Sequence, residues 1–302
     1  MPTVADHPAA PARWQDRFRT RTGGYVAYLG FLTLLFIQPL ASLMAHAAVS
    51  DLHSHIVLVP FISGYLFFIR RKQFPTAYTT SSLGAAAAGA VVIAALAARF
   101  ALRDNLSLND GLALMAVAFV SSIVAGGFLF LGSKWIVAAS FPLAFLIFLA
   151  PLPDSWVNSL ELASTHASAD ATATYFDVTA TPYVRHGQVF ELPGIAIEVA
   201  KECSGIRSSL VLFISSLLAS HLFLRARWAK ILLVAFVIPL GILRNGFRIL
   251  VIGLLCIHVG PHMIDSPIHH QGGPLFFALS LIPFGFLLWW LRRRERRHTL
   301  PV

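Results

Sequence analysis

Long apolar runs separated by short polar stretches occupy most of this 302-residue chain, and they constrain its fold more than any other feature. Apolar residues make up 57% of the sequence and charged residues 12%, about half the charged fraction of a soluble domain. A run of roughly 20 apolar residues is long enough to cross a bilayer as a helix. We therefore expect an all-α polytopic membrane protein. Eight runs are predicted to span: 24–45, 54–70, 81–101, 110–131, 135–151, 206–223, 229–257 and 274–291.

The basic residues follow this pattern of spans. Cytoplasmic loops of membrane proteins are enriched in Lys and Arg. With eight spans, 16 of the 23 basic residues lie on one side: Arg13, Arg17, Arg19, Arg21, Arg70, Arg71, Lys72, Lys134, Arg225, Arg227, Lys230, Arg292, Arg293, Arg294, Arg296 and Arg297. Both termini are therefore predicted to be cytoplasmic. The same distribution accounts for the net charge of +9 without a nucleic-acid partner.

Three parts are expected from this reading. Residues 1–23 form a cytoplasmic tail, residues 24–291 the transmembrane domain, and residues 292–302 a basic cytoplasmic tail. An apolar run that begins at Gly24 is too long for a cleaved secretory signal, so we expect it to remain as the first span.

One long loop, 152–204, is predicted to lie on the external side. Its first half is polar, rich in Ala and compatible with an amphipathic helix in the membrane interface. In its second half, two short β-like runs (188–192 and 195–199) flank Pro193-Gly194, as in a β-hairpin. A loop of this length is expected to cover or shape a functional site.

Three polar clusters stand near the predicted external face. They are Glu202-Cys203-Ser204-Gly205-Ile206-Arg207, Arg244-Asn245-Gly246-Phe247-Arg248 and His269-His270-Gln271-Gly272-Gly273. Ionisable groups in a membrane segment are costly and usually functional. Arg248 lies about 27 Å along a helix from Lys230, which places it near the outer leaflet. All three clusters therefore share one side of the predicted topology.

These clusters resemble the three signature motifs of the exosortase/archaeosortase family: the Cys203 segment, Asn245-x-x-Arg248, and His269-x-x-x-Gly273 with Phe277 beyond it. The resemblance covers roughly residues 24–291. Members of that family are polytopic cysteine transpeptidases or proteases. The resemblance implies a membrane-anchored substrate whose C-terminal sorting signal has a motif such as Pro-Glu-Pro, a transmembrane helix and a basic tail. It also implies a bacterial cytoplasmic (inner) membrane location, with the active site facing the exterior.

Family membership implies Cys203 as the nucleophile, with Arg248 and His269 as its catalytic partners. The residues fit these roles, because cations and a helix N-terminus favour the reactive thiolate. We expect Arg248 to stabilise an oxyanion and His269 to act in proton transfer. Which of these two donates the proton stays open. The supporting or substrate-binding candidates are Glu202, Arg207, Arg244, Asn245, His270 and Gly273.

Several alternatives remain at this point. Arg244 is either a substrate contact or an arginine that reaches toward water along the helix, and His270 rivals His269. An amine acceptor makes the enzyme a transpeptidase, whereas water makes it a protease. The second function considered is a transporter for an anionic substrate. No metal or other cofactor is expected, because the histidine spacing fits no ordered ligand set. Cys256, within an apolar run, is expected to be a small residue in the lipid phase or in the core.

Overall fold

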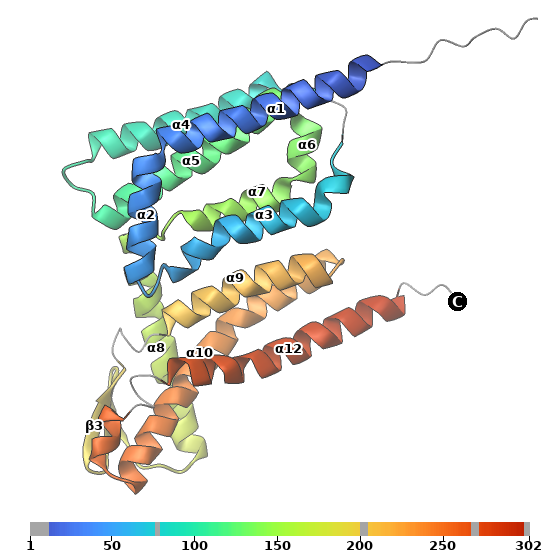
Figure 1. The fold of residues 1–302 in the computed structure, drawn as a ribbon. Helices are drawn as coiled ribbons and strands as arrows, with labels where there is room; N and C mark the ends of the chain where they lie inside the picture. The colour runs from blue at the N-terminus through green and yellow to red at the C-terminus, as the bar shows by residue number, and fades with distance from the viewer. Residues whose placement is uncertain (1–11, 76–78, 200–204, 267–271, 299–302) are drawn as a thin grey trace, which may run out of the picture. The chain divides into compact units, whose positions relative to one another are not determined.

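The computed structural model describes residues 12–75, 79–199, 205–266 and 272–298, and these form a mainly helical protein with one small sheet (Figure 1). The chain divides into two compact units, residues 1–154 and 155–302. The first unit contains α1 (Ala12–Leu35), α2 (Ile37–Val49), η1 (Ser54–Leu58), α3 (Val59–Arg70), η2 (Arg71–Gln73), α4 (Ser82–Ala101), α5 (Leu108–Phe130), α6 (Ser133–Ala138), α7 (Ser140–Phe145) and η3 (Leu146–Leu149). Helix α8 (Asp154–Val178) begins at the boundary.

The second unit continues with the sheet and the remaining helices. These are β1 (Val184–His186), β2 (Val189–Leu192), β3 (Ile195–Glu198), α9 (Ile206–Phe223), α10 (Arg227–His258), η5 (Pro261–Asp265) and α12 (Gly273–His298).

Five of the described helices are long and apolar enough to cross a membrane: α4, α5, α9, α10 and α12. Two broken pairs raise the number to seven if each pair is one span: Arg21–Leu35 with Ile37–Val49, bent by 69°, and Ser140–Leu149 with Asp154–Val178. The predicted span 54–70 is divided between η1 and the 12-residue α3. The structure thus supports five to seven spans. The predicted eight, and the cytoplasmic termini, stay predictions.

Proline explains why three of the predicted spans are interrupted. A proline ring clashes with the carbonyl four residues earlier and removes one helical hydrogen bond. Pro39 stands four residues after Leu35, where α1 ends, and Pro142 stands four residues after Ala138, where α6 ends. Pro60 occupies the first turn of α3. The apolar composition predicted these spans, but it does not report the breaks inside them.

Small residues on α4 and α5 allow close packing in the first unit. A Cβ added at Gly84 would lie 2.7 Å from the Phe128 ring, and one added at Gly126 would collide with the Tyr28 ring. The Tyr28 hydroxyl donates to the Ser122 carbonyl at 3.0 Å. Small residues thus allow α4 and α5 to pack closely against each other.

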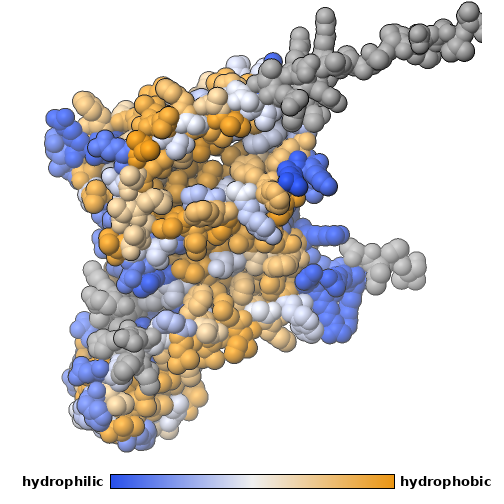
Figure 2. Space-filling model, viewed as in Figure 1, coloured by the Kyte–Doolittle hydropathy of each residue, from blue (hydrophilic) through white to orange (hydrophobic). Residues whose placement is uncertain are grey.

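Lipid-facing surface is visible on the helices of the second unit. On α12, a row of side chains at helical spacing is 46–68% exposed: Leu275, Leu279, Ile282, Phe286 and Trp289. Figure 2 shows hydrophobic side chains spread over the faces of the helices and hydrophilic ones at the C-terminal end of α12. Such a broad exposed apolar surface is expected for helices whose solvent is lipid.

The basic ends of α9, α10 and α12 lie together. The Glu295 carboxylate accepts hydrogen bonds from the Arg225 and Ala226 amides, each at 2.9 Å, where α9 connects to α10. Arg294 stacks at 5.5 Å over Trp228 and at 5.3 Å over Trp290. Tryptophan and basic side chains are characteristic of the membrane interface. The grouping agrees with the prediction that these loops share one side of the membrane.

The small sheet is antiparallel, in the order β1-β2-β3. Leu192 pairs with Ile195 across Pro193-Gly194, and Gly194 has φ = 85°, a conformation that favours glycine. The predicted hairpin is therefore confirmed, and β1 extends it by pairing Arg185 with Phe190.

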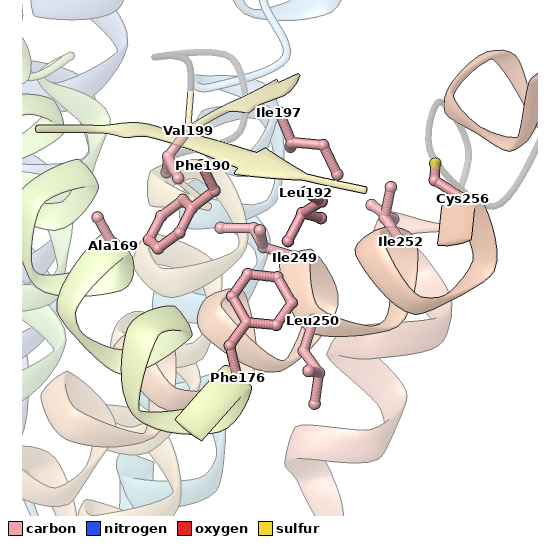
Figure 3. Close-up of a cluster of buried hydrophobic side chains, with 10 residues drawn as sticks. All are labelled: Ala169, Phe176, Phe190, Leu192, Ile197, Val199, Ile249, Leu250, Ile252 and Cys256. Atoms are coloured by element: carbon pink, nitrogen blue, oxygen red, sulfur yellow. The ribbon is translucent and has the colours of Figure 1, made fainter. Parts of the chain in front are cut away.

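The sheet is fixed onto α8 and the second half of α10 by a shared core (Figure 3). Phe176 and Phe190 are fully buried, with ring centroids 5.6 Å apart. Cys256 is a free thiol, 2% exposed, in the same cluster, so of its two expected positions it occupies the core. Helix α8 confirms the predicted helix in the first half of the loop. Its placement in the membrane interface stays a prediction.

Candidate active site

One turn of α10, residues 244–248, carries the second sequence motif and is largely enclosed. Arg244 is 7% exposed and Asn245 2% exposed. Gly246 allows close approach of α8, since a Cβ there would lie 2.9 Å from the Ala171 Cβ. The Phe247 ring contacts that of Tyr175, with centroids 6.1 Å apart. This turn is therefore a packed part of the protein core.

The first motif contacts this turn of α10 through Gly205. Arg244 Nη2 donates to the Gly205 carbonyl at 3.2 Å and to Ser209 Oγ at 3.1 Å. Gly205 precedes the first residue of α9 and has φ = 67°. A Cβ there would lie 3.2 Å from Arg244 Nη2 and from Asn245 Oδ1. The start of α9 is thus held against α10 at the residue two positions after Cys203.

The third motif reaches the same turn through the start of α12. Helix α12 begins at Gly273, and Phe276 in its first turn is 5% exposed. The rings of Phe276 and Phe247 meet edge to face, with centroids 6.3 Å apart. The flanks of the first and third motifs therefore both contact α10 between positions 244 and 248.

These contacts lie far from the basic residues along each of the three helices. Helix α9 has 18 residues, so Gly205 is about 27 Å from the Arg225 end of that helix. Arg244 is 17 residues along α10 from Arg227, or about 25 Å. Helix α12 begins beside Phe247 and bears Glu295 near its other end. Its motif contact and its basic residues therefore also lie at opposite ends of the helix. Within this unit, the motif flanks gather at the starts of α9 and α12 and near the middle of α10, and the basic residues gather about 25 Å away at the other ends of these helices.

Several predicted site residues lie outside the described residues: Glu202, Cys203, His269 and His270. Arg207 is described, as the second residue of α9, and its side chain is exposed. Arg248 is partly buried on α10. No described atom lies within 4 Å of a Cβ built at Gly273, so close approach to that glycine is not seen there.

Ser209 is a contact that the sequence did not predict. Its hydroxyl accepts from Arg244, and it lies so near α10 that a Cβ at Gly241 would be 2.6 Å from Ser209 Oγ. A serine in the first turn of an apolar helix carries no signal of its own. The small residues Ser209 on α9 and Gly241 on α10, taken together, would have been an indirect signal that the two helices pack closely.

Histidines of the first unit form a separate pair. The rings of His46 and His53 lie 5.5 Å apart, and Ser50 Oγ is 3.0 Å from His53 Nδ1. Burial, together with the neighbouring His46, lowers the pKa of His53 to about 4, so this ring is neutral at pH 7. Across the described ranges, no three His, Cys, Asp or Glu side chains are grouped to hold a metal ion.

Replacing Gly205 with alanine is expected to reduce the stability of the folded protein. An L-residue in the left-handed region costs about 1–2 kcal/mol, and the new methyl group would press on Arg244 and Asn245. The matched control is Gly187→Ala, at φ = 64° in the β1–β2 turn, where a Cβ meets nothing within 4 Å. Thermal unfolding is to be measured for both variants. Equal effects of the two variants would contradict a specific role for the Gly205 contact.

Comparison with known proteins identifies the family. A family model described as transmembrane exosortase matches residues 45–286. No curated protein and no solved structure matches the chain. The matched region includes all three sequence motifs, the whole of α8, α9 and α10, and the first half of α12. This multi-pass membrane protein therefore belongs to the transmembrane exosortase family.

Proposed function

We propose that the protein is an integral-membrane cysteine transpeptidase or protease that removes C-terminal sorting signals from exported proteins. The observation that supports this most directly is the contact of Gly205 with Arg244 and Asn245. It joins the segment that follows Cys203 to the Asn245-x-x-Arg248 motif. The contact of Phe276 with Phe247 adds the helix that follows the His269 motif.

The nucleophile in this proposal is the Cys203 thiolate. Cys203 stands three residues before the first residue of α9, whose N-terminus carries the positive end of the helix dipole. Positive charge near a cysteine favours the thiolate, the reactive form of the side chain. Arg244 donates to the carbonyl of Gly205, so at least one cation stands near this segment.

The proposed reaction is acyl transfer in two steps. Cys203 Sγ attacks the scissile carbonyl carbon, and the C=O electron pair moves to oxygen to form a tetrahedral oxyanion, which Arg248 stabilises. When the C–N bond breaks, the leaving amine takes a proton from His269, and a thioester remains. An acceptor amine or water then attacks the thioester and releases Cys203. Arg248 as the proton donor is the alternative, but a guanidinium holds its proton tightly and is therefore a weak acid.

The proposed substrate is an exported protein that ends in a sorting motif, a transmembrane helix and a basic tail. Its tail would lie on the cytoplasmic side, with the basic ends of α9, α10 and α12. The scissile bond would then meet the motif residues at the external side of a bacterial cytoplasmic membrane. The gathering of Arg225, Glu295 and Trp228 at one helix end, and of Gly205 and Phe276 at the other, supports this orientation.

The two neighbouring histidines provide a test of the assigned roles. His269→Ala is expected to slow processing of a co-expressed sorting-signal protein about 10²- to 10⁴-fold, the usual contribution of general acid–base catalysis. His270→Ala, the adjacent control, is expected to remain within a few-fold of the wild type. Rates are to be followed by the loss of the full-length substrate. The reverse ranking would transfer the role to His270, and equal rates for both variants would contradict histidine catalysis.

A further inference from the structure

The Arg244 guanidinium uses one of its two terminal nitrogens within the protein. Nη2 donates to the Gly205 carbonyl and to Ser209 Oγ. Nη1 is buried and has no hydrogen-bond partner in the described part of the chain. The side chain belongs to a residue that is only 7% exposed, so it does not reach toward water along the helix surface. Of the two alternatives for Arg244, the geometry favours a ligand contact.

Among the residues that the structure describes, the Arg244 guanidinium has no anionic partner. The described ion pairs join Arg103 to Asp104, Arg185 to Asp170 and His186 to Glu191, so none of them includes Arg244. A buried charge is tolerated when it is paired and hydrogen-bonded, and an unused donor retains its full desolvation cost. The free form of the protein therefore holds a donor that a ligand oxygen can satisfy.

Two further features make the surroundings of Arg244 positive. Arg248 stands four residues later and so projects from the same side of α10. The N-terminus of α9 begins at the residue to which Arg244 is bonded, and its N-cap, Gly205, provides no side-chain cap. A helix N-terminus favours negative charge through its dipole. All three features favour an anion.

We propose that Arg244 Nη1 and the N-terminus of α9 form a binding site for an anionic oxygen of the substrate. This inference rests on the proposed function. The oxygen has two sources in that reaction: a carboxylate of the substrate peptide, or the oxyanion that develops on the scissile carbonyl. In both cases Nη2 keeps α9 in place while Nη1 contacts the substrate. Arg244 is thus a substrate-binding residue in addition to Arg248.

Steady-state kinetics of the purified full-length enzyme in lipid nanodiscs tests this proposal. The substrate is a sorting-signal protein that the wild type processes. Arg244→Gln is expected to lower kcat/KM about 10- to 100-fold, because a charged donor to the substrate is lost. Ser209→Ala removes one partner of Nη2 and leaves Nη1 unchanged, so it is expected to stay within about threefold of the wild type.

Whether Arg244→Gln changes kcat or KM shows which of the two substrate oxygens binds to Arg244. A lower kcat at constant KM assigns it to the transition-state oxyanion, whereas a higher KM at constant kcat assigns it to a substrate carboxylate. In the second case, changing acidic residues of the substrate to their amides should reproduce the rise in KM with the wild-type enzyme. Wild-type values for Arg244→Gln, or a loss equal to that of Ser209→Ala, would overturn the proposal.

Two controls keep the outcomes separate. If Arg244→Gln fails to fold, as judged by its melting temperature and elution profile, the same kinetic test is made with Arg244→Lys. A lysine ammonium cannot hold Gly205 and the substrate in the geometry of a planar fork, so kcat/KM should fall about tenfold, and wild-type values would overturn the inference. A folded wild type that processes no sorting-signal substrate would overturn the proposed function itself. A wild type that processes its substrate no faster than Arg244→Gln would overturn only the role of Arg244.

Discussion

Replacing Cys203 with alanine is expected to abolish removal of the sorting signal, with a rate loss of at least about a thousandfold. Removing the nucleophile of a cooperating catalytic set eliminates nearly all of its chemical rate enhancement. Processing of a co-expressed substrate, followed over time at matched enzyme abundance, measures the effect. Cys203→Ser should retain only trace activity, because a hydroxyl is far less ionised than a thiol near neutral pH.

The second cysteine provides the matched control for this experiment. Cys256 is 2% exposed and packs among apolar residues on α8, α10 and the sheet. Cys256→Ala is therefore expected to reduce stability modestly through a small cavity and to leave processing near the wild-type rate. Unchanged processing by Cys203→Ala would contradict the cysteine mechanism and make the transporter function the one to test.

Replacing Arg248 with glutamine is expected to lower kcat about 100- to 1000-fold and to change KM little. This is the usual effect of deleting one oxyanion donor, because the donor acts mainly in the transition state. Single-turnover rates with saturating enzyme report the chemical step directly. The fall should exceed that of Arg244→Gln if Arg248 is the principal oxyanion donor.

A matched Arg→Gln control is available in the small sheet. Arg185 forms a partly exposed ion pair with Asp170 at 2.7 Å, away from the motif residues in sequence. Exposed ion pairs contribute little to stability, so Arg185→Gln should process substrate at close to the wild-type rate. If Arg248→Gln instead raises KM while kcat stays constant, Arg248 binds the ground-state substrate and the assigned catalytic role is wrong.

The long apolar helices were the part of the fold that the sequence predicted best. The predicted span 206–223 coincides with α9, and those at 81–101 and 110–131 differ from α4 and α5 by at most two residues at either end. Continuous apolar runs of membrane length have few alternatives in lipid, because the backbone must satisfy its own hydrogen bonds. The sequence motifs likewise predicted the family that the comparison with known proteins identified.

Proline breaks and short strands were predicted less well. Pro39 and Pro142 interrupt predicted helices, yet α10 continues through Pro239. The effect of a proline therefore depends on whether neighbouring groups compensate for the lost hydrogen bond. Strand β1 covers three residues, too few for a recognisable alternation, and it forms by pairing with β2.

The pairwise contacts of the candidate site required the structure. The motif spacing placed Arg244 and Asn245 on a helix near the external side, but not their contact with Gly205. That contact depends on how α9 and α10 pack, which is governed by small residues such as Gly241 and Ser209. Sequence periodicity reports which face of a helix is apolar, and it does not report the partner of that face.

The measurement that tests the central claim most directly is the intact mass of a sorting-signal protein co-expressed with the wild type or with Cys203→Ala. We predict that the wild type yields a product without the C-terminal helix and basic tail. Its mass locates the cleaved bond and shows whether water or an amine was added. With Cys203→Ala, at equal abundance, the substrate should keep its full mass. The same truncated product with both enzymes would contradict acyl transfer through Cys203.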